Sequence, residues 1–428
     1  GFAGGPRGMR VDYDTVSGGD NGYAEAVRVT YDPKIVSYGT LLRIFFSVIA
    51  DPTLLNRQGP DRGTQYRSAL FPLNGEQDRA ARAYLALITK HSPEQNAVAE
   101  LEAAWQQRHP RDIEGGLQLA HAIAKVHEDL ADPAGAMDWL DKGKALVRQN
   151  IPSQRMQNQA SFEAAEALCH TLGVNSEVQT GGPIFIVGLP RTGTTLVDRI
   201  ISSHSGIVSA GERPEFGAFL KRAVGNDSAD MLDAGTIKGA AGTDLLAVGQ
   251  NYIESVQGIL NGAQRFTDKM PINALLVPAI LAALPNARVI CLRRQPADSV
   301  LSIYRQLFAL SALHYRCAHS LEDLADYVAR FHGLVETYTG ALPSSRFTLV
   351  DYETLVEEPE AETRRLLEFC GLDFEQACLD FQENTAPVAT ASVAQVRQPM
   401  YRSSVDRWKR YQPQLEPALE ILRKAGRL

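Results

Sequence analysis

In this chain of 428 residues, the segment most informative about the fold is Ile184-Phe-Ile-Val-Gly188-Leu-Pro-Arg191-Thr-Gly193-Thr194-Thr195-Leu-Val197. It opens with a short apolar run, which suits a buried strand of a parallel sheet. A turn bracketed by two glycines with GxxxxG spacing follows, and the apolar residues after it recur at helical spacing. Backbone N–H groups in such a turn, together with the start of the helix, form a nest for a phosphate. The stretch therefore predicts an α/β fold with a phosphate-binding loop between a strand and a helix.

The turn departs from the loop of nucleotide triphosphatases. Arg191, Thr194 and Thr195 can add positive charge and hydroxyl donors to the nest. A Walker A loop would continue Gly-Lys-Ser/Thr, with the Lys serving the transferred γ-phosphate and the hydroxyl serving Mg²⁺. Thr194 stands where that Lys would be. The departure points away from NTP hydrolysis, although a P-loop kinase or NTPase remains an alternative, as does a helical-repeat scaffold that binds nucleotide without turnover.

A second basic site lies downstream of the glycine turn. The segment 288–292 reads as a buried strand, and it is followed by Arg293-Arg294-Gln295-Pro296-Ala297-Asp298 and by a helix that carries Ser302. Arginines at the carboxyl end of a parallel strand make an anion pocket at the sheet edge where ligands usually bind. A third strand is expected at 347–350. The two sites together predict a parallel sheet that binds a ligand with two phosphates.

Three parts of the chain differ in composition and in the spacing of their apolar residues. Residues 1–90 begin glycine-rich and contain a strand-like alternation over 25–31. Residues 91–178 show helical periods at 98–105, 117–130, 136–147 and 162–172, for which tetratricopeptide-type helix pairs and a plain helical connector both remain open. Residues 179–428 alternate strands and helices. We therefore expect a partial α+β segment, a helical segment and a parallel-sheet α/β domain.

Composition excludes several classes of function. The chain is 44% hydrophobic and 22% charged, as globular proteins usually are, and its formal net charge of -7 argues against nucleic-acid binding. Its five cysteines form no CxxC pair, so neither a zinc site nor a disulfide framework is indicated. No run of 18 apolar residues occurs, so no membrane span is expected. A reducing, cytoplasmic location fits this composition best.

These motifs carry a family resemblance. PxxR[ST]GTT after a strand, then DKxP, then RRxPxDxxxS resembles the sulfotransferases that use 3′-phosphoadenosine 5′-phosphosulfate (PAPS), over about residues 115–428. Within that family, the chain is most similar to the bacterial tetratricopeptide–sulfotransferase proteins, which are related to protein-tyrosine sulfotransferases. One departure is that Gln295 stands where the family commonly has Asp. The resemblance implies transfer of a sulfuryl group from PAPS, without a metal, to a hydroxyl on a protein, a carbohydrate or a small molecule. A peptide partner for the helical segment stays open.

The resemblance also implies a set of cofactor-binding residues. The 5′-phosphosulfate would contact the glycine turn, the 3′-phosphate would contact the second basic site, and a YExL position and a carboxy-terminal loop would lie close to the nucleotide. In that order the residues are Arg191, Thr192, Gly193, Thr194 and Thr195; Arg294 and Ser302; Tyr352; and Ser392, Gln395 and Arg397.

Catalysis of sulfuryl transfer requires removal of the acceptor's proton and stabilisation of the charge that builds on the leaving oxygen. By the same resemblance, Glu212 falls where protein-sulfating members carry a catalytic Glu, but the spacing is inexact and Glu215 remains a candidate. Lys269 matches a lysine that stabilises the leaving group, and Arg191 is expected to contact the same leaving group. His204 and His314 are further candidates for the base.

Residues 1–90 resemble a different family, the A-type peptide-methionine (S)-S-oxide reductases. The matching segments include Tyr31-Asp-Pro33 and the long run from Asn56 to Ser68, and the resemblance places Tyr13, Glu25, Asp61 and Tyr66 in the substrate pocket. That family attacks the sulfoxide with a cysteine of a GCFWG motif, which would lie upstream of Gly1, and the first cysteine here is Cys169. A sulfoxide needs a thiolate nucleophile. We therefore expect a truncated, inactive reductase segment, with residual reductase activity as the alternative.

Overall fold

The computed structural model describes residues 69–88, 97–178, 181–260, 263, 265–384, 400, 402 and 404–428, and parts of 1–62. The chain divides into two compact units, Gly1–Val147 and Arg148–Leu428. The second unit contains the sheet and every described residue that the sequence places in the sulfotransferase-like site.

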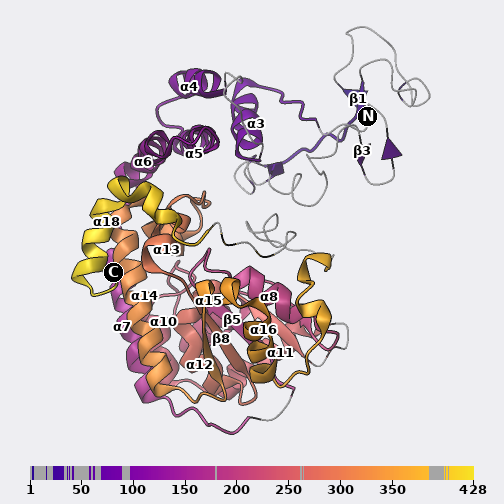
Figure 1. Cartoon of the computed structure of the whole chain (residues 1–428), viewed down its shortest axis with the longest axis vertical. Coiled ribbons are helices and arrows are strands. Elements are labelled where there is room, and N and C mark those ends of the chain that lie inside the picture. The colour runs from indigo at the N-terminus through magenta and orange to yellow at the C-terminus, as the bar shows by residue number, and fades with distance from the viewer. Residues whose placement is uncertain are drawn as a thin grey trace. The chain divides into compact units, whose positions relative to one another are not determined.

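A five-stranded sheet forms the centre of the second unit, and all of its strand pairs are parallel. Its order is β6-β7-β5-β8-β9, so β5 lies in the middle with later strands on both sides (Figure 1). The parallel sheet that the sequence predicts is confirmed. The strands are β5 (Ile184–Gly188), β6 (Val208–Ser209), β7 (Phe266–Lys269), β8 (Arg288–Arg293) and β9 (Phe347–Asp351).

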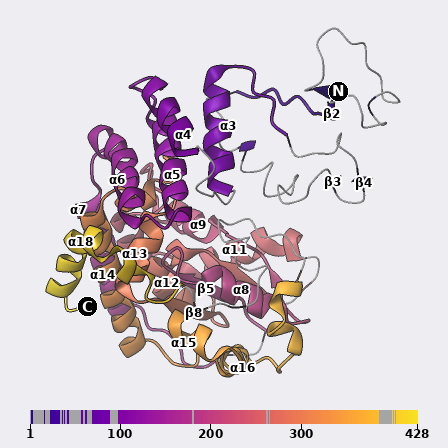
Figure 2. The same ribbon diagram turned by 45° about the horizontal axis from the view of Figure 1, so that its top comes forward.

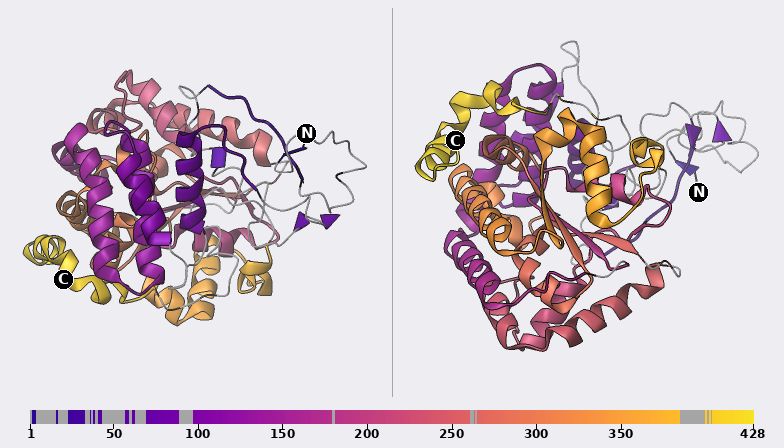
Figure 3. Two further views of the ribbon diagram at one scale, coloured as in Figure 1. Left: turned by 90° about the horizontal axis from the view of Figure 1, so that it is seen from above. Right: turned by 60° about the horizontal axis from the view of Figure 1, so that its bottom comes forward.

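Helices lie on both faces of this sheet, as the view in the right half of Figure 3 makes visible. The helices of the second unit are α7 (Arg155–Thr171), α8 (Thr194–Ser202), α9 (Glu215–Val224), α10 (Ala234–Gly239), α11 (Leu245–Leu260), α12 (Val277–Ala283), α13 (Pro296–Tyr304), α14 (Leu321–Ala341), α15 (Tyr352–Glu357), α16 (Pro359–Cys370) and α18 (Gln412–Lys424), and its longer 3₁₀ segments are η4 (Pro271–Leu276) and η5 (Leu313–His319). Residues 404–411, here called the C-terminal segment, precede α18.

Both faces of β5 are buried, which explains its unbroken apolar sequence. Ile184 and Ile186 belong to a core cluster with residues of α8 and α16. Phe185 faces the other way and packs against Phe216 of α9 and Tyr252 of α11, with ring centres 6.3 and 5.6 Å apart. Burial on both sides fixes β5 firmly, and the turn that follows it has a rigid support.

Of the described helices of the first unit, those after residue 96 follow the predicted periods closely, whereas the helix over residues 75–88 was not predicted. These helices are α3 (Gly75–Ile88), α4 (Ala97–Gln107), α5 (Ile113–Asp129) and α6 (Pro133–Asn150), and Figure 2 shows α3, α4 and α5 next to one another. Asp112 caps α5 by accepting a hydrogen bond of 2.8 Å from the Gly115 N–H. Trp105 and Trp139 meet edge to face with ring centres 5.3 Å apart.

The strand predicted over residues 25–31 is wrong beyond its first residue. Only Ala24–Glu25 forms a strand, β2, which pairs with β1 (Phe2–Ala3), and residues 26–32 have no regular structure. Val27 and Val29 are exposed by 89% and 60%. Alternation of β-branched residues favours a strand only where a partner strand and a core cover one face, and no described strand does so here. A second short pair joins β3 (Arg57–Gln58) to β4 (Asp61–Arg62).

In the part of the chain that the structure describes, no helix has both the length and the apolar character needed to cross a membrane.

Candidate functional site

The candidate site lies at the carboxyl edge of the sheet, because the candidate residues follow the ends of its strands. Arg191 follows β5, Glu212 follows β6, Lys269 ends β7, Arg294 follows β8 and Tyr352 follows β9. Carboxyl ends of parallel strands meet at one edge, and the reversal of strand order around β5 opens a crevice there. The short strands β6 and β7, which the sequence did not predict, carry two of these five residues.

The turn between β5 and α8 has a constrained backbone. Arg191 and Gly193 have positive φ angles of 67° and 98°. The buried Thr192 hydroxyl donates a hydrogen bond of 2.7 Å to the Leu189 carbonyl and so closes the turn on itself. A Cβ atom at Gly193 would lie only 2.8 Å from Cδ2 of Tyr352, so glycine is needed for this ring to approach the loop.

The turn leads directly into the N-terminus of α8. Thr194 and Thr195 form its first turn and are 4% and 7% exposed. The first N–H groups of a helix have no acceptor within the helix, and the helix dipole adds partial positive charge at this end. The loop and the helix start therefore present donors and positive potential together, which suits a phosphate or a sulfate group.

Arg294 connects the second basic site to this loop. Its Nη1 donates to the Arg191 carbonyl at 3.2 Å and to the Ser302 hydroxyl at 3.0 Å. Its guanidinium carbon lies 4.8 Å from the centre of the Tyr352 ring. The side chain is 5% exposed, and its Nε is buried without a hydrogen-bond partner among the described residues. A buried donor with no acceptor, next to a phosphate-type loop, fits an anionic ligand.

The C-terminal segment contacts the same arginine. Arg294 Nη2 donates to the Ser404 carbonyl and lies 3.9 Å from the Asp298 carboxylate. Asp298 in turn accepts hydrogen bonds from the backbone N–H groups of Asp406, at 2.8 Å, and Trp408, at 2.9 Å. Burial raises the pKa of Asp298, and these hydrogen bonds and Arg294 oppose the rise. Asp298 thus holds both Arg294 and the C-terminal segment.

Lys269 and Glu212 form an ion pair beside the loop. Lys269 is 2% exposed, and its Nζ donates to Glu212 Oε1. Its backbone N–H also donates to the Gly211 carbonyl at 2.9 Å, which fixes the segment that carries the glutamate. In the sheet Lys269 is paired with Ile186, two residues before Gly188. The Glu212 side chain is 43% exposed, so an acceptor can reach it from solvent.

Asp198 of α8 ties the loop helix to the strands that carry this ion pair. Its carboxylate accepts hydrogen bonds from the hydroxyls of Thr267 on β7, at 2.5 Å, and Ser209 on β6, at 3.0 Å. Burial raises the pKa of Asp198, while the two hydroxyls and the nearby Lys269 charge lower it.

A second buried carboxyl lies on the other face of β7. Asp268 is fully buried and accepts a hydrogen bond of 2.6 Å from the Tyr252 hydroxyl. Burial raises its pKa to about 8, although the Tyr252 hydrogen bond and the Arg213 backbone N–H oppose the rise. Arg213 and Glu215 form an ion pair close to it. Asp268 is therefore protonated at neutral pH, when most carboxyls are charged.

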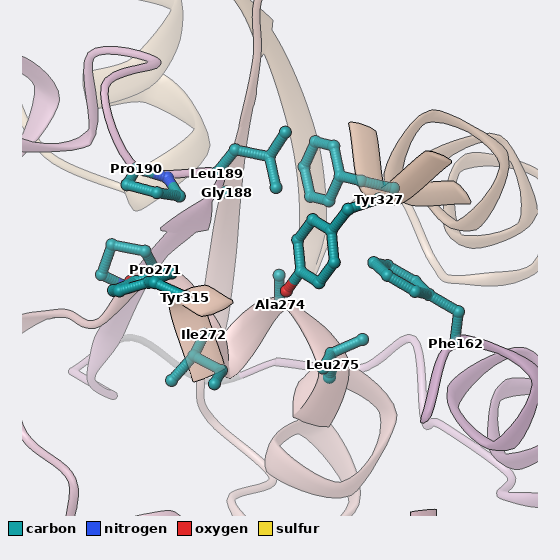
Figure 4. Close-up of a pocket in the computed structure, with 11 residues that line it drawn as sticks. Phe162, Gly188, Leu189, Pro190, Pro271, Ile272, Ala274, Leu275, Tyr315 and Tyr327 are labelled. Carbon is teal, nitrogen blue, oxygen red and sulfur yellow. The ribbon is translucent and has the colours of Figure 1, made fainter. Parts of the chain in front are cut away.

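A narrow apolar pocket adjoins the loop (Figure 4). Its cavity volume is about 10 Å³, roughly the room that one water molecule needs. The Glu212 charge raises the pKa of Tyr315, after the larger effect of burial, and burial lowers the pKa of the neighbouring His314, so all three side chains lie close together. The pocket is lined by Phe162, Gly188, Leu189, Pro190, Pro271, Ile272, Ala274, Leu275, Tyr315, Tyr327 and Phe331.

Other candidates lie away from the ion pair or outside the description. Glu215 pairs with Arg213, and His204 lies 3.3 Å from Glu375 and accepts a hydrogen bond from the Gly206 N–H. Outside the described residues are Ser392, Gln395 and Arg397, together with Tyr13 and Tyr66 and the side chains of Glu25 and Asp61.

Sequence reasoning missed Asp198, Asp298 and Tyr315. Asp298 is the Asp of the motif RRxPxDxxxS, but the motif does not reveal its partners. These are Asp406 and Trp408, more than a hundred residues away in the sequence. No local signal in the sequence joins them. In the described part of the chain, no group of three or more His, Cys, Asp or Glu side chains is arranged to hold a metal ion.

Fold and site together define a parallel-sheet α/β domain with a phosphate-type loop, and comparison with known proteins gives its family. Residues 183–376 match the sulfotransferase family, and residues 1–107 match peptide methionine sulfoxide reductase. The chain therefore carries a sulfotransferase-family domain, preceded by a segment of the reductase family.

Related sequences match this chain over very different lengths. An uncharacterized protein of Aquifex aeolicus is 36% identical over 319 residues, which are 71% of this chain and 41% of that protein. The peptide methionine sulfoxide reductase MsrA of Deinococcus radiodurans is 63% identical over 71 residues, or 17% of this chain and 34% of the reductase. The chain thus spans less than half the length of either relative. Among solved structures, the sulfotransferase domain from the curacin biosynthetic pathway aligns with a TM-score of 0.39 and 19% identity, over 59% of this chain and 99% of that domain.

Proposed function

We propose that the second unit is a PAPS-dependent sulfotransferase that moves a sulfuryl group to a hydroxyl acceptor. The observation that carries the proposal is the position of Arg294, whose buried Nε lacks an acceptor while its Nη1 bridges the Arg191 carbonyl and Ser302. A ligand with one phosphate at the loop and another at Arg294 would supply acceptors both to the loop's N–H groups and to the Arg294 side chain. Adenosine 3′,5′-bisphosphate, the part of PAPS that is not transferred, has this arrangement of phosphates.

The proposed binding roles divide between the two basic sites. The backbone of the loop, with Arg191, Thr194 and Thr195, holds the 5′-phosphosulfate, while Arg294 and Ser302 hold the 3′-phosphate. Thr192 closes the turn with its hydroxyl and offers its backbone to the ligand. Tyr352 lies against Gly193 and borders the nucleotide, and Ser392 and Arg397 complete the cofactor site.

The proposed catalytic roles belong to the ion pair and Arg191. Glu212 takes the proton from the acceptor hydroxyl as its oxygen attacks sulfur. The bond between sulfur and the bridging phosphate oxygen breaks, and adenosine 3′,5′-bisphosphate leaves with the bonding electrons. Lys269 and Arg191 stabilise the charge that develops on this oxygen. The contact between Lys269 and Glu212 supports Glu212 over Glu215 as the base, because Glu215 is paired with Arg213 instead.

The direct test is sulfuryl transfer itself. Purified protein is incubated with PAPS and hydroxyl-bearing acceptors, namely a tyrosine peptide, an oligosaccharide and a small phenol, and the products are analysed by mass spectrometry. We expect one acceptor class to gain a sulfuryl group without added metal. The absence of any sulfated product, together with preferred binding of ATP and Mg²⁺, would favour a kinase instead.

A binding prediction tests the nucleotide site separately. Adenosine 3′,5′-bisphosphate should bind without Mg²⁺, and Arg294→Ala should weaken it by about 10- to 150-fold, because a desolvated arginine–phosphate contact contributes roughly 1.5–3 kcal/mol. Isothermal titration calorimetry measures both. Arg364→Ala on the exposed side of α16 is the matched control and should leave the affinity unchanged. Unchanged affinity in Arg294→Ala would remove this arginine from the site.

The remaining assignments are part of the same proposal. Residues 179–428 act as the sulfotransferase domain, residues 91–178 as a helical segment that can present a peptide partner, and residues 1–90 as an inactive reductase-like segment. The protein acts in the cytoplasm, with neither nucleic acid nor membrane as a partner. Its acceptor is a protein, a carbohydrate or a small molecule with a hydroxyl group.

A further inference from the structure

Three arginines lie at the opposite edge of the sheet from the candidate site. Arg265 immediately precedes β7, Arg288 is the first residue of β8, and Arg346 immediately precedes β9. Because all strands are parallel, the starts of these strands share the amino edge. Burial lowers the pKa values of Arg265 and Arg346, and the charge of Arg288 lowers both further. The charge of Arg288 is therefore close enough to each of the other two to repel it.

The two outer arginines bind the ends of helices. Arg265 donates to the carbonyls of Cys370 and Gly371 at the end of α16, the latter at 3.3 Å. Arg346 donates to the carbonyls of Leu281, at 2.9 Å, and Leu284, at 2.7 Å, where α12 ends. Helix C-termini expose carbonyls and carry partial negative charge, so a cation is stabilised at both places. Helix ends supply acceptors for both side chains, although the buried Nε of Arg265 has no partner among the described residues.

Arg288, which lies between them, has no such acceptor. Its side chain is 7% exposed, and its Nε and Nη1 are buried without a hydrogen bond among the described residues. No described carboxylate forms an ion pair with any of the three arginines. A buried guanidinium without acceptor or counter-charge is costly, whereas the same group beside an anion is stabilised.

There is open space beside this guanidinium. Gly371 is exposed, and a Cβ atom built on it would meet only one heavy atom within 4 Å, the Arg288 Nη2 at 3.8 Å. Arg265 reaches the same place, because its Nη1 contacts the Gly371 carbonyl. Two guanidinium groups thus converge on a surface position that no described acidic side chain occupies. Planar guanidinium groups match the oxygens of phosphate and sulfate better than they match a monatomic anion.

We propose that Arg288, assisted by Arg265, binds a free inorganic oxyanion such as phosphate at the amino edge of the sheet beside Gly371. This site is separate from the nucleotide loop at the carboxyl edge. The anion accepts from Arg288 Nη2, the nitrogen that faces the open space, and supplies the negative charge that the arginine cluster lacks. Its binding stabilises the folded protein and leaves the chemistry at the other edge of the sheet unchanged.

The experiment measures thermal unfolding against phosphate concentration, with saturating adenosine 3′,5′-bisphosphate to occupy the nucleotide loop and with chloride at matched ionic strength as reference. Phosphate at roughly 50 times its dissociation constant should raise the Tm of the wild type by about 5 °C. Arg288→Met should abolish this response, and its Tm without phosphate should equal or exceed that of the wild type. Arg364→Met, on the exposed face of nearby α16, should respond as the wild type does.

Two results would overturn the proposal. One is an equal phosphate response in Arg288→Met and the wild type. The other is a Tm of Arg288→Met that, without phosphate, lies well below that of the wild type, which is what a purely structural arginine gives. If Arg288→Met does not fold, Arg265→Met provides the same comparison. Repeating the titration in Arg294→Ala, without nucleotide, separates this site from the proposed nucleotide site, because the response should persist there.

Discussion

Glu212 and Glu215 stand three positions apart, yet their side chains meet different partners, Lys269 and Arg213. We expect Glu212→Gln to lower turnover roughly 100-fold or more, because the amide keeps the size of the acid but cannot accept a proton, and general-base catalysis contributes about 10²–10⁴. Affinity for adenosine 3′,5′-bisphosphate should stay nearly intact. Steady-state rates and calorimetry measure the two effects.

Glu215→Gln is the matched control for this substitution and should keep most of the activity. The reverse pattern, with Glu215→Gln inactive and Glu212→Gln active, would move the base by three residues. If both variants remain active, the proton goes elsewhere, and His314, which lies close to Glu212, is the next residue to change.

Asp268 should make stability depend on pH. Its pKa is raised from 3.8 to about 8 by burial, so between these values the folded protein keeps a proton that the unfolded chain has lost. Its contribution to stability is therefore intact at low pH, falls as the pH rises through this window, and is constant above about 8. Asp268→Asn removes the titration while keeping an acceptor for the Tyr252 hydroxyl.

The free energy of unfolding of Asp268→Asn should therefore increasingly exceed that of the wild type from pH 5 to pH 8, with a level difference above about pH 8. Urea unfolding at a series of pH values measures this difference, and Asp244→Asn at the start of α11 is an exposed control. A difference that does not change with pH would show that Asp268 is ionised throughout.

The contact between α13 and the C-terminal segment should couple nucleotide binding to the local order of that segment. Asp298→Ala removes the acceptor for the N–H groups of Asp406 and Trp408 and the charge beside Arg294. Hydrogen exchange at these amides should become faster, and affinity for adenosine 3′,5′-bisphosphate should fall by about tenfold, the effect of one ordinary hydrogen bond.

Glu416→Ala on the exposed face of α18 is the control for this substitution and should change neither quantity. Faster exchange with unchanged affinity would mean that the segment is held in place without any connection to the nucleotide.

Elements with a long repeating pattern could be predicted from the sequence, and short ones could not. The helical periods after residue 97 correspond to α4, α5, α6 and α7, since each repeats an apolar face over three or more turns. The strand β7 escaped because it has four residues, of which Thr267, Asp268 and Lys269 are polar but buried. Their burial depends on partners in α8, α11 and the segment after β6, which no local pattern reveals.

We expect this chain to reduce no methionine sulfoxide. The reaction needs an accessible thiolate, and all five cysteines are buried. Burial raises the pKa of Cys169 to about 11 and that of Cys291 to about 12, so their thiols stay protonated at neutral pH. Incubation with a methionine (S)-sulfoxide peptide and dithiothreitol should give no product above the protein-free control, whereas product formation by the purified chain would contradict this.

The sequence predicted those contacts of the candidate site that lie within one short motif, and it missed those that join distant parts of the chain. The glycine turn and the Arg294–Ser302 pair each lie within one short motif, and the structure brings these two motifs together through the Arg191 carbonyl. The contact between Lys269 and Glu212 joins two strand ends, so it depends on the order of strands in the sheet. The contact between Arg294 and Ser404 spans 110 positions, and only the folded chain reveals it.

At Arg191, the left-handed backbone conformation lowers the stability of the fold, while the side chain supplies positive charge to the loop. Glycine would adopt a φ of 67° without strain, whereas a residue with a Cβ atom in a sparsely populated conformation costs about 1–3 kcal/mol. The surrounding turn, closed by Thr192 and bordered by Arg294, has to hold arginine there against this cost. Selection for stability alone would therefore favour glycine at this position. Arginine is retained only where function requires positive charge in the loop.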